Sequence, residues 1–467
     1  MLFSSTLFIY IFLPIVLAVY FIVPKKHVDF RNAVLLIASL VFYAWGEPIY
    51  VALMIYSIIF NYFMALEIAR EKKRGGSGKI NFVFTVIVNL FILCFFKYYG
   101  FLMDNINSWF NLGIRYSALS LPIGISFYTF QALSYIIDVY RGRVRAQGNL
   151  LRFAVYLSLF PQLIAGPIVK YRDIETRLRK REITFSSFGQ GAERFVFGLG
   201  KKVLLANNLG ALHQAVTALS ADQQSTAALW IGITAYTMQI YFDFSGYSDM
   251  AIGLGKMFGF DFLENFEHPY ISRSVTEFWR RWHISLSSWF REYLYIPLGG
   301  NRVTVPRHML NLMIVWGLTG LWHGASWNFV FWGMYYGILL ILEKYIWGSG
   351  LEKLPKVFGT VITMILVMIG WVFFSSPDLT SAFGYLGGMF GIGSTAAFNG
   401  TSGYLIKTNA IMLVIGLIFC GPGPYDSYKK LSEKVPVVPA FTILLIMILS
   451  TAYLVYSSYN PFLYFRF

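Results

Sequence analysis

The chain has 467 residues, of which 57% are hydrophobic and 13% are charged, and its mean hydropathy is +0.58. This composition excludes a soluble globule and predicts an all-α polytopic membrane protein. The net charge of +15 does not indicate nucleic-acid binding, because the basic residues lie in short loops between apolar segments, as the positive-inside rule requires. We therefore expect no nucleic-acid partner.

The N-terminal part of the chain predicts five transmembrane helices. The apolar segments are 2–23, 32–45, 48–68, 80–96 and 121–139. The first is longer than the apolar core of a cleaved leader and no small-residue cleavage site follows it, so we expect it to be retained. Basic residues cluster after the first, third and fifth segments, which places the N-terminus outside the cytoplasm.

The middle of the chain, about 152–325, is interrupted by proline and glycine, for example at Pro161, Gly198 and Gly200. Broken helices are tolerated at membrane depth only inside protein or beside a cavity, so we expect half-spanning or re-entrant helices here. Plain apolar segments then return, and a basic loop before the last one places the C-terminus outside as well. These later segments are 308–321, 326–347, 357–374, 405–421 and 437–457.

Polar residues inside apolar segments mark candidate sites, because ionisable groups at membrane depth are costly. In 232–256 helical spacing places Tyr236, Gln239, Asp243 and Tyr247 on one face, with Asp249 close by. An Asp at the bilayer centre costs about 2.5–3.5 kcal/mol, so Asp243 needs a partner or water. An ion pair with a central arginine is favoured over direct chemistry.

Two histidines lie in aromatic surroundings. The segment 278–293 contains Trp282, His283 and Ser287, and two interpretations stay open for it: an amphipathic helix in the membrane interface, or a buried site that includes His283. The second histidine, His323, follows Trp322 between two apolar stretches. It is either a functional group or an imidazole that only bonds a neighbouring helix.

Three motifs together resemble the membrane-bound O-acyltransferase family, over about residues 1–420. They are Asp243–Asp249, Phe278–Tyr293 and Trp322–Gly324. The resemblance is closest to the bacterial branch, which includes the alginate O-acetylation membrane protein and the lipoteichoic-acid D-alanyl transferase. It implies a ring of about 11 to 12 transmembrane helices with half helices around a central tunnel. It also implies that His323 is the catalytic base and His283 the second site residue. The residues expected to support them are Trp322, Asp243, Asp249, Trp282, Ser287 and Gln239.

The chain ends in an aromatic cluster, 461–467. Such a cluster anchors a helix end at the membrane interface. It also resembles the Phe-x-Tyr-x-x-Phe terminus of the small single-span protein of the D-alanylation machinery, with Phe462, Tyr464 and Phe467 at the matching positions. That likeness implies an acyl relay, in which the Tyr464 phenol accepts the acyl group and His323 takes the phenol proton.

We expect the chain to be organised in four parts. They are N-terminal helices in 1–150, a core of broken helices in 151–330, further helices in 331–435, and a final helix with the relay tail in 436–467.

The resemblance implies a membrane O-acyltransferase in the bacterial cytoplasmic membrane that moves acetyl to a cell-surface or secreted polysaccharide. The donor is expected to be acetyl-CoA or an acylated carrier protein, and no cofactor is expected to be bound. An extracytoplasmic SGNH-type acyltransferase is the expected partner, beside membrane lipid and the polysaccharide. The alternatives are D-alanyl transfer to teichoic acid, a non-enzymatic transporter or export channel, and a scaffold for a synthase complex. No metal is expected, since the histidines show no ligand spacing; His27, His213 and His308 are interpreted as loop or interface residues.

Overall fold

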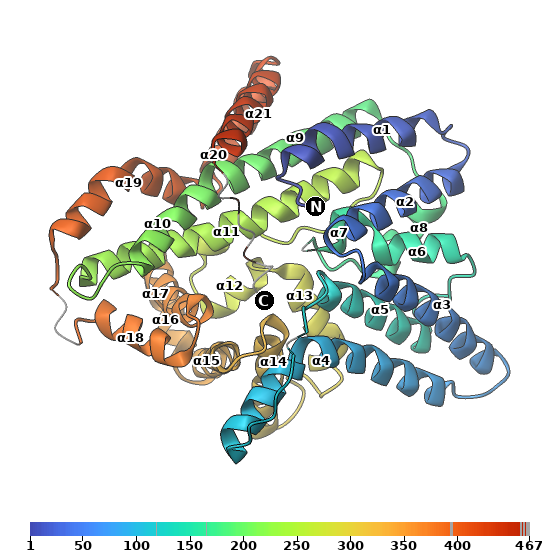
Figure 1. The fold of residues 1–467 in the computed structure, drawn as a ribbon, viewed down its shortest axis with the longest axis horizontal. Helices are drawn as coiled ribbons and strands as arrows, with labels where there is room; N and C mark the ends of the chain where they lie inside the picture. Colours follow the sequence, from blue (N-terminus) through green and yellow to red (C-terminus); the bar gives the residue numbers. More distant parts are fainter. Residues whose placement is uncertain (118, 165, 393–395, 458–459, 461–462, 464–467) are drawn as a thin grey trace. The chain divides into compact units, whose positions relative to one another are not determined.

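The computed structural model describes every residue except 118, 165, 393–395, 458–459, 461–462 and 464–467 (Figure 1). This described part is helical, with no strand and one isolated bridge between Ser225 and Ala396, which confirms the all-α prediction. It divides into two compact units. The first is Met1–Phe195 with Ser248–Leu263, and the second is Val196–Tyr247 with Glu264–Phe467.

The first unit contains the N-terminal helices. They are η1 (Phe8–Phe12), α1 (Leu13–Ile22), α2 (Val28–Gly46), α3 (Val51–Lys73), α4 (Lys79–Phe110), α5 (Ile125–Tyr140), α6 (Leu150–Ser158), α7 (Phe160–Leu163), α8 (Tyr171–Arg179) and most of α9 (Phe185–Gly200). All five predicted segments are helical. The predicted end at residue 96 was wrong, since α4 continues to Phe110. Lys97, the first residue after the predicted segment, lies inside the helix and donates to Ser126 Oγ at 3.4 Å.

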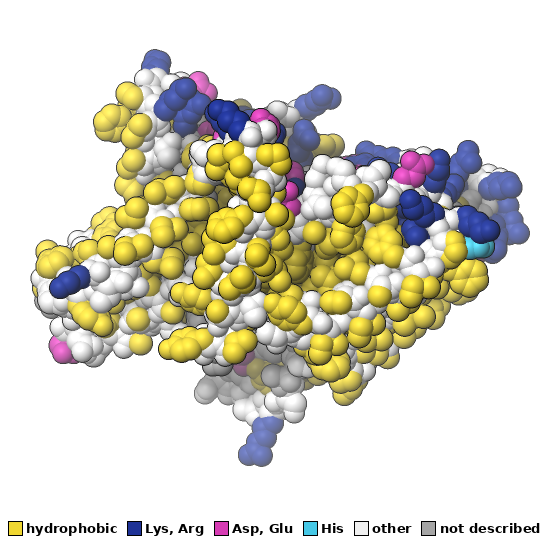
Figure 2. Space-filling model, turned by 90° about the horizontal axis from the view of Figure 1, so that it is seen from above, with side chains coloured by type: hydrophobic (Ala, Val, Ile, Leu, Met, Phe, Trp, Pro, Cys, Tyr) yellow, Lys and Arg dark blue, Asp and Glu magenta, His cyan; other side chains and the backbone are white. Residues whose placement is uncertain are grey.

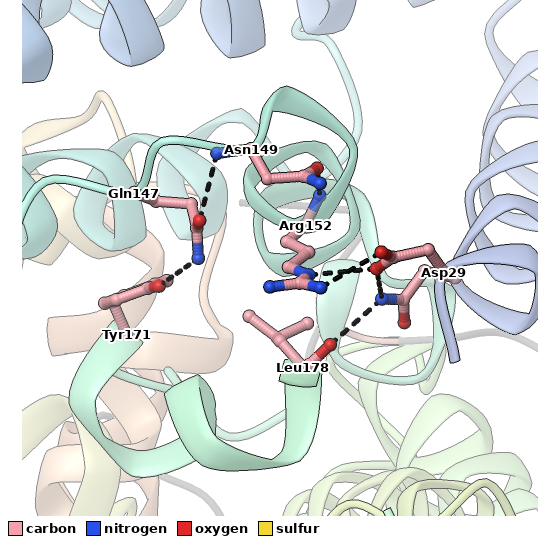
Figure 3. Close-up of polar contacts among 7 residues, drawn as sticks. Asp29, Gln147, Asn149, Arg152, Tyr171 and Leu178 are labelled. Carbon is pink, nitrogen blue, oxygen red and sulfur yellow. Dashed lines mark hydrogen bonds and ion pairs between the residues drawn. The ribbon is translucent and has the colours of Figure 1, made fainter. Parts of the chain in front are cut away.

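Polar contacts join α2, α6 and α8 within the first unit (Figure 3). Arg152 donates from Nε and Nη2 to the two carboxylate oxygens of Asp29, at 2.9 and 3.0 Å. Asn149 caps α6 by accepting the Arg152 N–H at 3.1 Å, as expected for an N-cap residue. Gln147 accepts the Asn149 N–H and donates to Tyr171 Oη at 2.6 Å. The end of the loop after α5 and the start of α6 are thus held to α2 and α8, while Arg141, Arg143 and Arg145 of the same loop are exposed.

The second unit contains the remaining helices. They are η2 (Lys201–Ala206), α10 (Asn207–Thr217), α11 (Thr226–Met257, of which Ser248 onward belongs to the first unit), η3 (Pro269–Ile271), α12 (Val275–Arg281), α13 (Ile284–Phe290), η4 (Arg291–Tyr295), α14 (Val305–His323), α15 (Trp327–Leu342), η5 (Glu343–Trp347), α16 (Gly348–Lys353), α17 (Lys356–Ser375), α18 (Leu379–Met389), α19 (Gly400–Phe419), α20 (Gly423–Lys434) and α21 (Val438–Tyr456). All five later apolar segments lie mainly in helices.

Only part of the predicted interruption in the middle of the chain is found. The helix breaks at Leu159, between α6 and α7, one residue before the Phe160–Pro161 step. Gly198 and Gly200 do not interrupt the chain, because α9 continues into η2 and α10 without a gap. A Cβ on Gly200 would lie only 2.9 Å from the Ile446 side chain of α21. This glycine therefore allows close helix packing instead of ending a helix.

The surface is that of a multi-pass membrane protein. Seven helical segments of the described chain are long and apolar enough to cross a membrane: Val28–Gly46, Val51–Lys73, Lys79–Phe110, Trp327–Lys353, Lys356–Ser375, Gly400–Phe419 and Val438–Tyr456. The other predicted spans form helices that are shorter or more polar. Figure 2 shows apolar side chains over most of the face it presents, with many Lys and Arg side chains gathered toward its upper edge.

Candidate active site

The expected base, His323, is the last residue of α14 and is 6% exposed. α14 packs against α15 at glycines, which let helix backbones approach closely in a membrane. A Cβ on Gly320 would lie 2.3 Å from the carbonyl oxygen of Phe329, and one on Gly333 would lie 2.2 Å from that of Trp316. The end of α14 is therefore held against α15 within one turn of His323.

Aromatic rings surround the His323 imidazole. The ring centroids of Trp322, Trp332 and Phe374 lie 5.1, 5.0 and 5.3 Å from the imidazole centroid, all edge-on. The next residue, Gly324, has no space for a side chain, because a Cβ there would lie 2.2 Å from the Phe329 ring. Walls of this kind exclude water and strengthen electrostatic interactions with a bound reactant. An imidazole held in such a cage suits the role of general base.

His283 lies at a break in the chain. Its φ is +46°, in the left-handed region, and it separates α12 from α13. Residues 278–293 therefore do not form one continuous amphipathic helix. Asn265 Oδ1 lies 3.3 Å from His283 Nδ1 and accepts the Ser285 N–H at 3.1 Å. Because this oxygen is an acceptor, Nδ1 carries a proton, and in the neutral form of this imidazole Nε2 is the acceptor.

One indole lies next to both histidines. The Trp322 ring centroid is 6.1 Å from that of His283 and 5.1 Å from that of His323. The two residues that the sequence nominates separately, from segments far apart in the chain, thus share a neighbour in the second unit. This arrangement is compatible with one site that contains both histidines, as the family resemblance implies.

A cavity of about 960 Å³ in the second unit has His283 in its wall. Four polar residues at helical spacing in 278–293 line it: Arg280, His283, Ser287 and Arg291. His323 is not among the described residues that do so. The lining includes five basic and three acidic side chains: Arg273, Arg280, Arg291, Lys344 and Lys356, and Glu277, Glu343 and Glu352. This excess of positive charge favours a ligand that carries phosphate.

A buried carboxylate holds one wall of this cavity. Glu343 accepts the N–H of Val275 at 2.7 Å and that of Thr276 at 2.9 Å, one on each carboxylate oxygen. These are first-turn N–H groups of α12, which have no acceptor within the helix, and the negative charge suits the helix N-terminus. Glu343 was not among the residues predicted from the sequence. The signal was present, since it is a single acid at the end of an apolar segment.

Asp243 is in the predicted ion pair, but its partner is a lysine and not an arginine. Lys202 Nζ lies 2.5 Å from Asp243 Oδ1, and the two side chains are 3% and 2% exposed. The arginine expectation was wrong because Lys202 lies in η2, in an apolar stretch that we expected to be broken. A lysine in such a stretch is itself a signal for a buried partner.

One described residue of the C-terminal tail contacts the same pair. The Leu463 N–H donates to Asp243 Oδ2 at 2.9 Å. Farther up the tail, Asn207 Nδ2 donates to Asn460 Oδ1 at 3.2 Å. The three residues of the predicted tail motif, Phe462, Tyr464 and Phe467, lie outside the described residues.

Three other residues that were expected to support the site make contacts of their own elsewhere in the fold. Asp249 belongs to the first unit, where its Oδ1 accepts Nε and Nη2 of Arg194 at 3.1 and 2.8 Å. Gln239 is buried in α11. Trp282 is a packing residue whose ring centroid lies 5.0 Å from that of Trp371.

The remaining histidines are spread over the chain. His27 is exposed before α2, and His213 Nδ1 lies 3.0 Å from the Gly232 carbonyl oxygen. His308 is not in a loop: it is buried in α14, with Tyr295 Oη 2.8 Å from Nε2 and Tyr345 Oη 2.7 Å from Nδ1. The described residues contain no group of three His, Cys, Asp or Glu side chains that could hold a metal ion.

Comparison with known proteins gives one consistent result. The family model of the membrane-bound O-acyltransferases matches residues 143–349. A probable alginate O-acetylase of Azotobacter vinelandii is 44% identical over 84% of this chain and 79% of its own length. One from Pseudomonas putida is 40% identical over the full length of both chains. A peptidoglycan O-acetyltransferase of Helicobacter pylori is 33% identical over 100% of this chain and 98% of its own.

Proposed function

Since the chain belongs to the membrane-bound O-acyltransferase family, we propose that it moves an acetyl group from a cytoplasmic thioester across the membrane for O-acetylation of a cell-surface or secreted polysaccharide. Relatives named as acetylases of alginate and of peptidoglycan support both the acetyl group and an envelope polysaccharide as its destination. D-Alanyl transfer to teichoic acid is the alternative that the same chemistry allows.

The observation that carries the proposal is the pairing of an enclosed imidazole with a basic cavity. His323 lies in an aromatic cage, and its neighbour Trp322 also lies beside His283, which lines the cavity. Acetyl-CoA and an acylated carrier protein both carry their thioester on a phosphopantetheine arm. Arg280 and Arg291 in the cavity wall suit that phosphate. We propose that a donor bound in the cavity extends its thioester beyond His283, so that the thioester carbonyl carbon lies close to His323.

The chemistry takes two balanced steps. In the first, the Tyr464 phenol oxygen attacks the thioester carbonyl carbon while His323 takes the phenol proton. The C–S bond breaks, and the thiolate leaves and is protonated to the thiol. In the second, an acceptor hydroxyl attacks the aryl ester and releases the phenol. Because a phenol has a pKa near 10, far below that of a sugar hydroxyl, this second step runs downhill. His283 positions the thioester or stabilises developing charge.

The proposal also includes location and partners. The chain lies in a bacterial cytoplasmic membrane with both termini outside, as the loop charges favour. The donor approaches from the cytoplasm, and an extracytoplasmic SGNH-type acyltransferase carries the acetyl group from Tyr464 to the polysaccharide.

Mass spectrometry of the C-terminal peptide tests the proposal. Purified protein is incubated with labelled acetyl-CoA, acetyl carrier protein or D-alanyl carrier protein. Wild type is compared with His323→Gln, Tyr464→Phe and a control, Tyr456→Phe, which alters an exposed tyrosine at the end of α21. We expect an acetyl ester on Tyr464 in wild type and control, and none in the other two.

The outcomes separate the parts of the proposal. If the tail is never labelled but polysaccharide acetylation still requires His323, the relay is wrong and the base assignment stands. If acetylation is unaffected in His323→Gln, the base assignment is wrong. Labelling by the D-alanyl donor alone would replace acetyl by the alternative group.

A further inference from the structure

We propose that the buried Asp243–Lys202 pair anchors the C-terminal tail through one charge-assisted hydrogen bond to the backbone of Leu463. The catalytic consequence of this anchor rests on the proposed relay through Tyr464, but the anchor itself does not. Asp243 is then a positioning residue and takes no part in proton transfer.

The two oxygens of Asp243 have different partners. Oδ1 lies 2.5 Å from Lys202 Nζ, and Oδ2 accepts the Leu463 N–H at 2.9 Å. Asp243 and Lys202 are each 2% exposed and Leu463 is 7% exposed. A carboxylate so deeply buried is tolerated only when its charge is compensated and its oxygens accept hydrogen bonds. The lysine supplies the charge, and the tail supplies a donor for the second oxygen.

One stretch of helix brings the last helix and the tail to this pair. At its start, Gly200 has no side chain, and a Cβ there would lie 2.9 Å from Ile446 of α21. At its end, Asn207 donates to Asn460 at 3.2 Å. Lys202 lies between these two contacts in η2. This short segment therefore contacts both α21 and residue 460, and its Lys202 pairs with Asp243 of α11, which holds residue 463.

The anchor binds the backbone and not a side chain. The hydrogen bond is made by the N–H of residue 463. Because Leu463 directly precedes Tyr464, holding its amide limits the region that the Tyr464 phenol can reach. A reactant that is held in this way pays less entropy at the reaction step.

Two matched double variants test the anchor. Lys202→Met/Asp243→Asn and Lys202→Met/Asp243→Leu are both uncharged and have the same number of side-chain heavy atoms branched at Cγ, but only Asn can accept the Leu463 N–H. Each is treated with carboxypeptidase in detergent, and loss of C-terminal residues is followed by intact mass. We expect the tail of the Leu variant to be trimmed roughly tenfold or more faster. Equal rates for the two variants would overturn the anchor.

A second pair leaves the buried charges untouched, in case the double variants fold poorly. Leu463→Pro removes the N–H, while Leu463→Ala keeps it. Faster trimming of the Pro variant than of the Ala variant supports the anchor, and equal trimming rejects it.

Enzyme kinetics then separate the anchor from the relay. With an anchored relay, the Leu double variant has a lower kcat and an unchanged KM for the donor, because Asp243 does not line the donor cavity. If wild-type Tyr464 is never labelled while trimming still differs, the relay fails and the anchor stands. If Tyr464 is labelled and trimming is equal, the anchor fails and the relay stands.

Discussion

Replacing Gly320 with alanine tests whether the contact between α14 and α15 positions His323. The added Cβ would lie 2.3 Å from the Phe329 carbonyl oxygen, whereas real Cβ atoms essentially never come closer than 3.0 Å to such an atom. Since the obstacle is backbone, the two helices must separate by about 1 Å. His323 follows Gly320 within one helical turn, so its imidazole moves with the backbone. A displacement of that size at a reacting group costs on the order of 10²-fold in rate.

The same helix provides the control. A Cβ on Gly317 would have its nearest neighbour, the sulfur of Met334, at 3.6 Å, which is an ordinary contact. Gly317→Ala should therefore be neutral or stabilising by up to about 1 kcal/mol, because alanine is the better helix former. Gly320→Ala should instead lose about 1–3 kcal/mol through overpacking.

Both variants are compared with wild type by thermal unfolding in detergent and by initial rates of acetyl transfer. We expect kcat to fall about a hundredfold in Gly320→Ala and to stay within about twofold in Gly317→Ala. A folded Gly320→Ala protein that keeps more than half of the wild-type kcat would refute the reasoning. Equal losses in both variants would refute it as well, since they would point to α14 in general and not to the crossing with α15.

Three further predictions concern the surroundings of the site. Glu343→Gln keeps one acceptor for the two N–H groups at the start of α12, so we expect unfolding to become easier by about 1–2 kcal/mol, with no such change in the exposed Glu352→Gln. Arg280→Gln and Arg291→Gln should each raise the donor KM severalfold at unchanged kcat, and this effect should shrink at high salt. Burial lowers the pKa of His268, so the folded state binds its proton less readily than the unfolded state. Stability should therefore fall as the pH drops below about 6.5, and it should fall less in His268→Gln.

The positions of the helices were predictable because a membrane imposes a minimum length of apolar chain. Segment 357–374 is found as α17, and 437–457 as α21, with ends within a few residues. The prediction errors occur at residues whose type is compatible with two different local structures. The segment was predicted to end before Lys97, although a lysine within a membrane helix can direct its long side chain to a hydrogen-bond acceptor on a neighbouring helix. Gly200 suggested a break, although a glycine also permits close packing.

The sequence nominates residues for the candidate site but not the connections between them. The aromatic surroundings left two interpretations open for each of His323 and His283, and the family resemblance favoured a site role for both. Arg280 and Arg291, which helical spacing places near His283, line the same cavity as that histidine. The contact partners of these residues could not be predicted, because a contact between two segments far apart in the chain produces no periodic pattern in a single sequence. Lys202 with Asp243 is such a pairing, and so is the amide of Leu463.

The contacts of the buried acids bear on which group acts as the base. Glu343 uses both carboxylate oxygens for N–H groups of α12, and Asp243 divides its oxygens between Lys202 and the tail. A carboxylate in such contacts loses them when it is protonated, so it is poorly suited to accept a proton in each catalytic cycle. An imidazole changes charge near neutral pH and can pass a proton on. The acids thus hold the scaffold, which supports the proposal that a histidine transfers the proton.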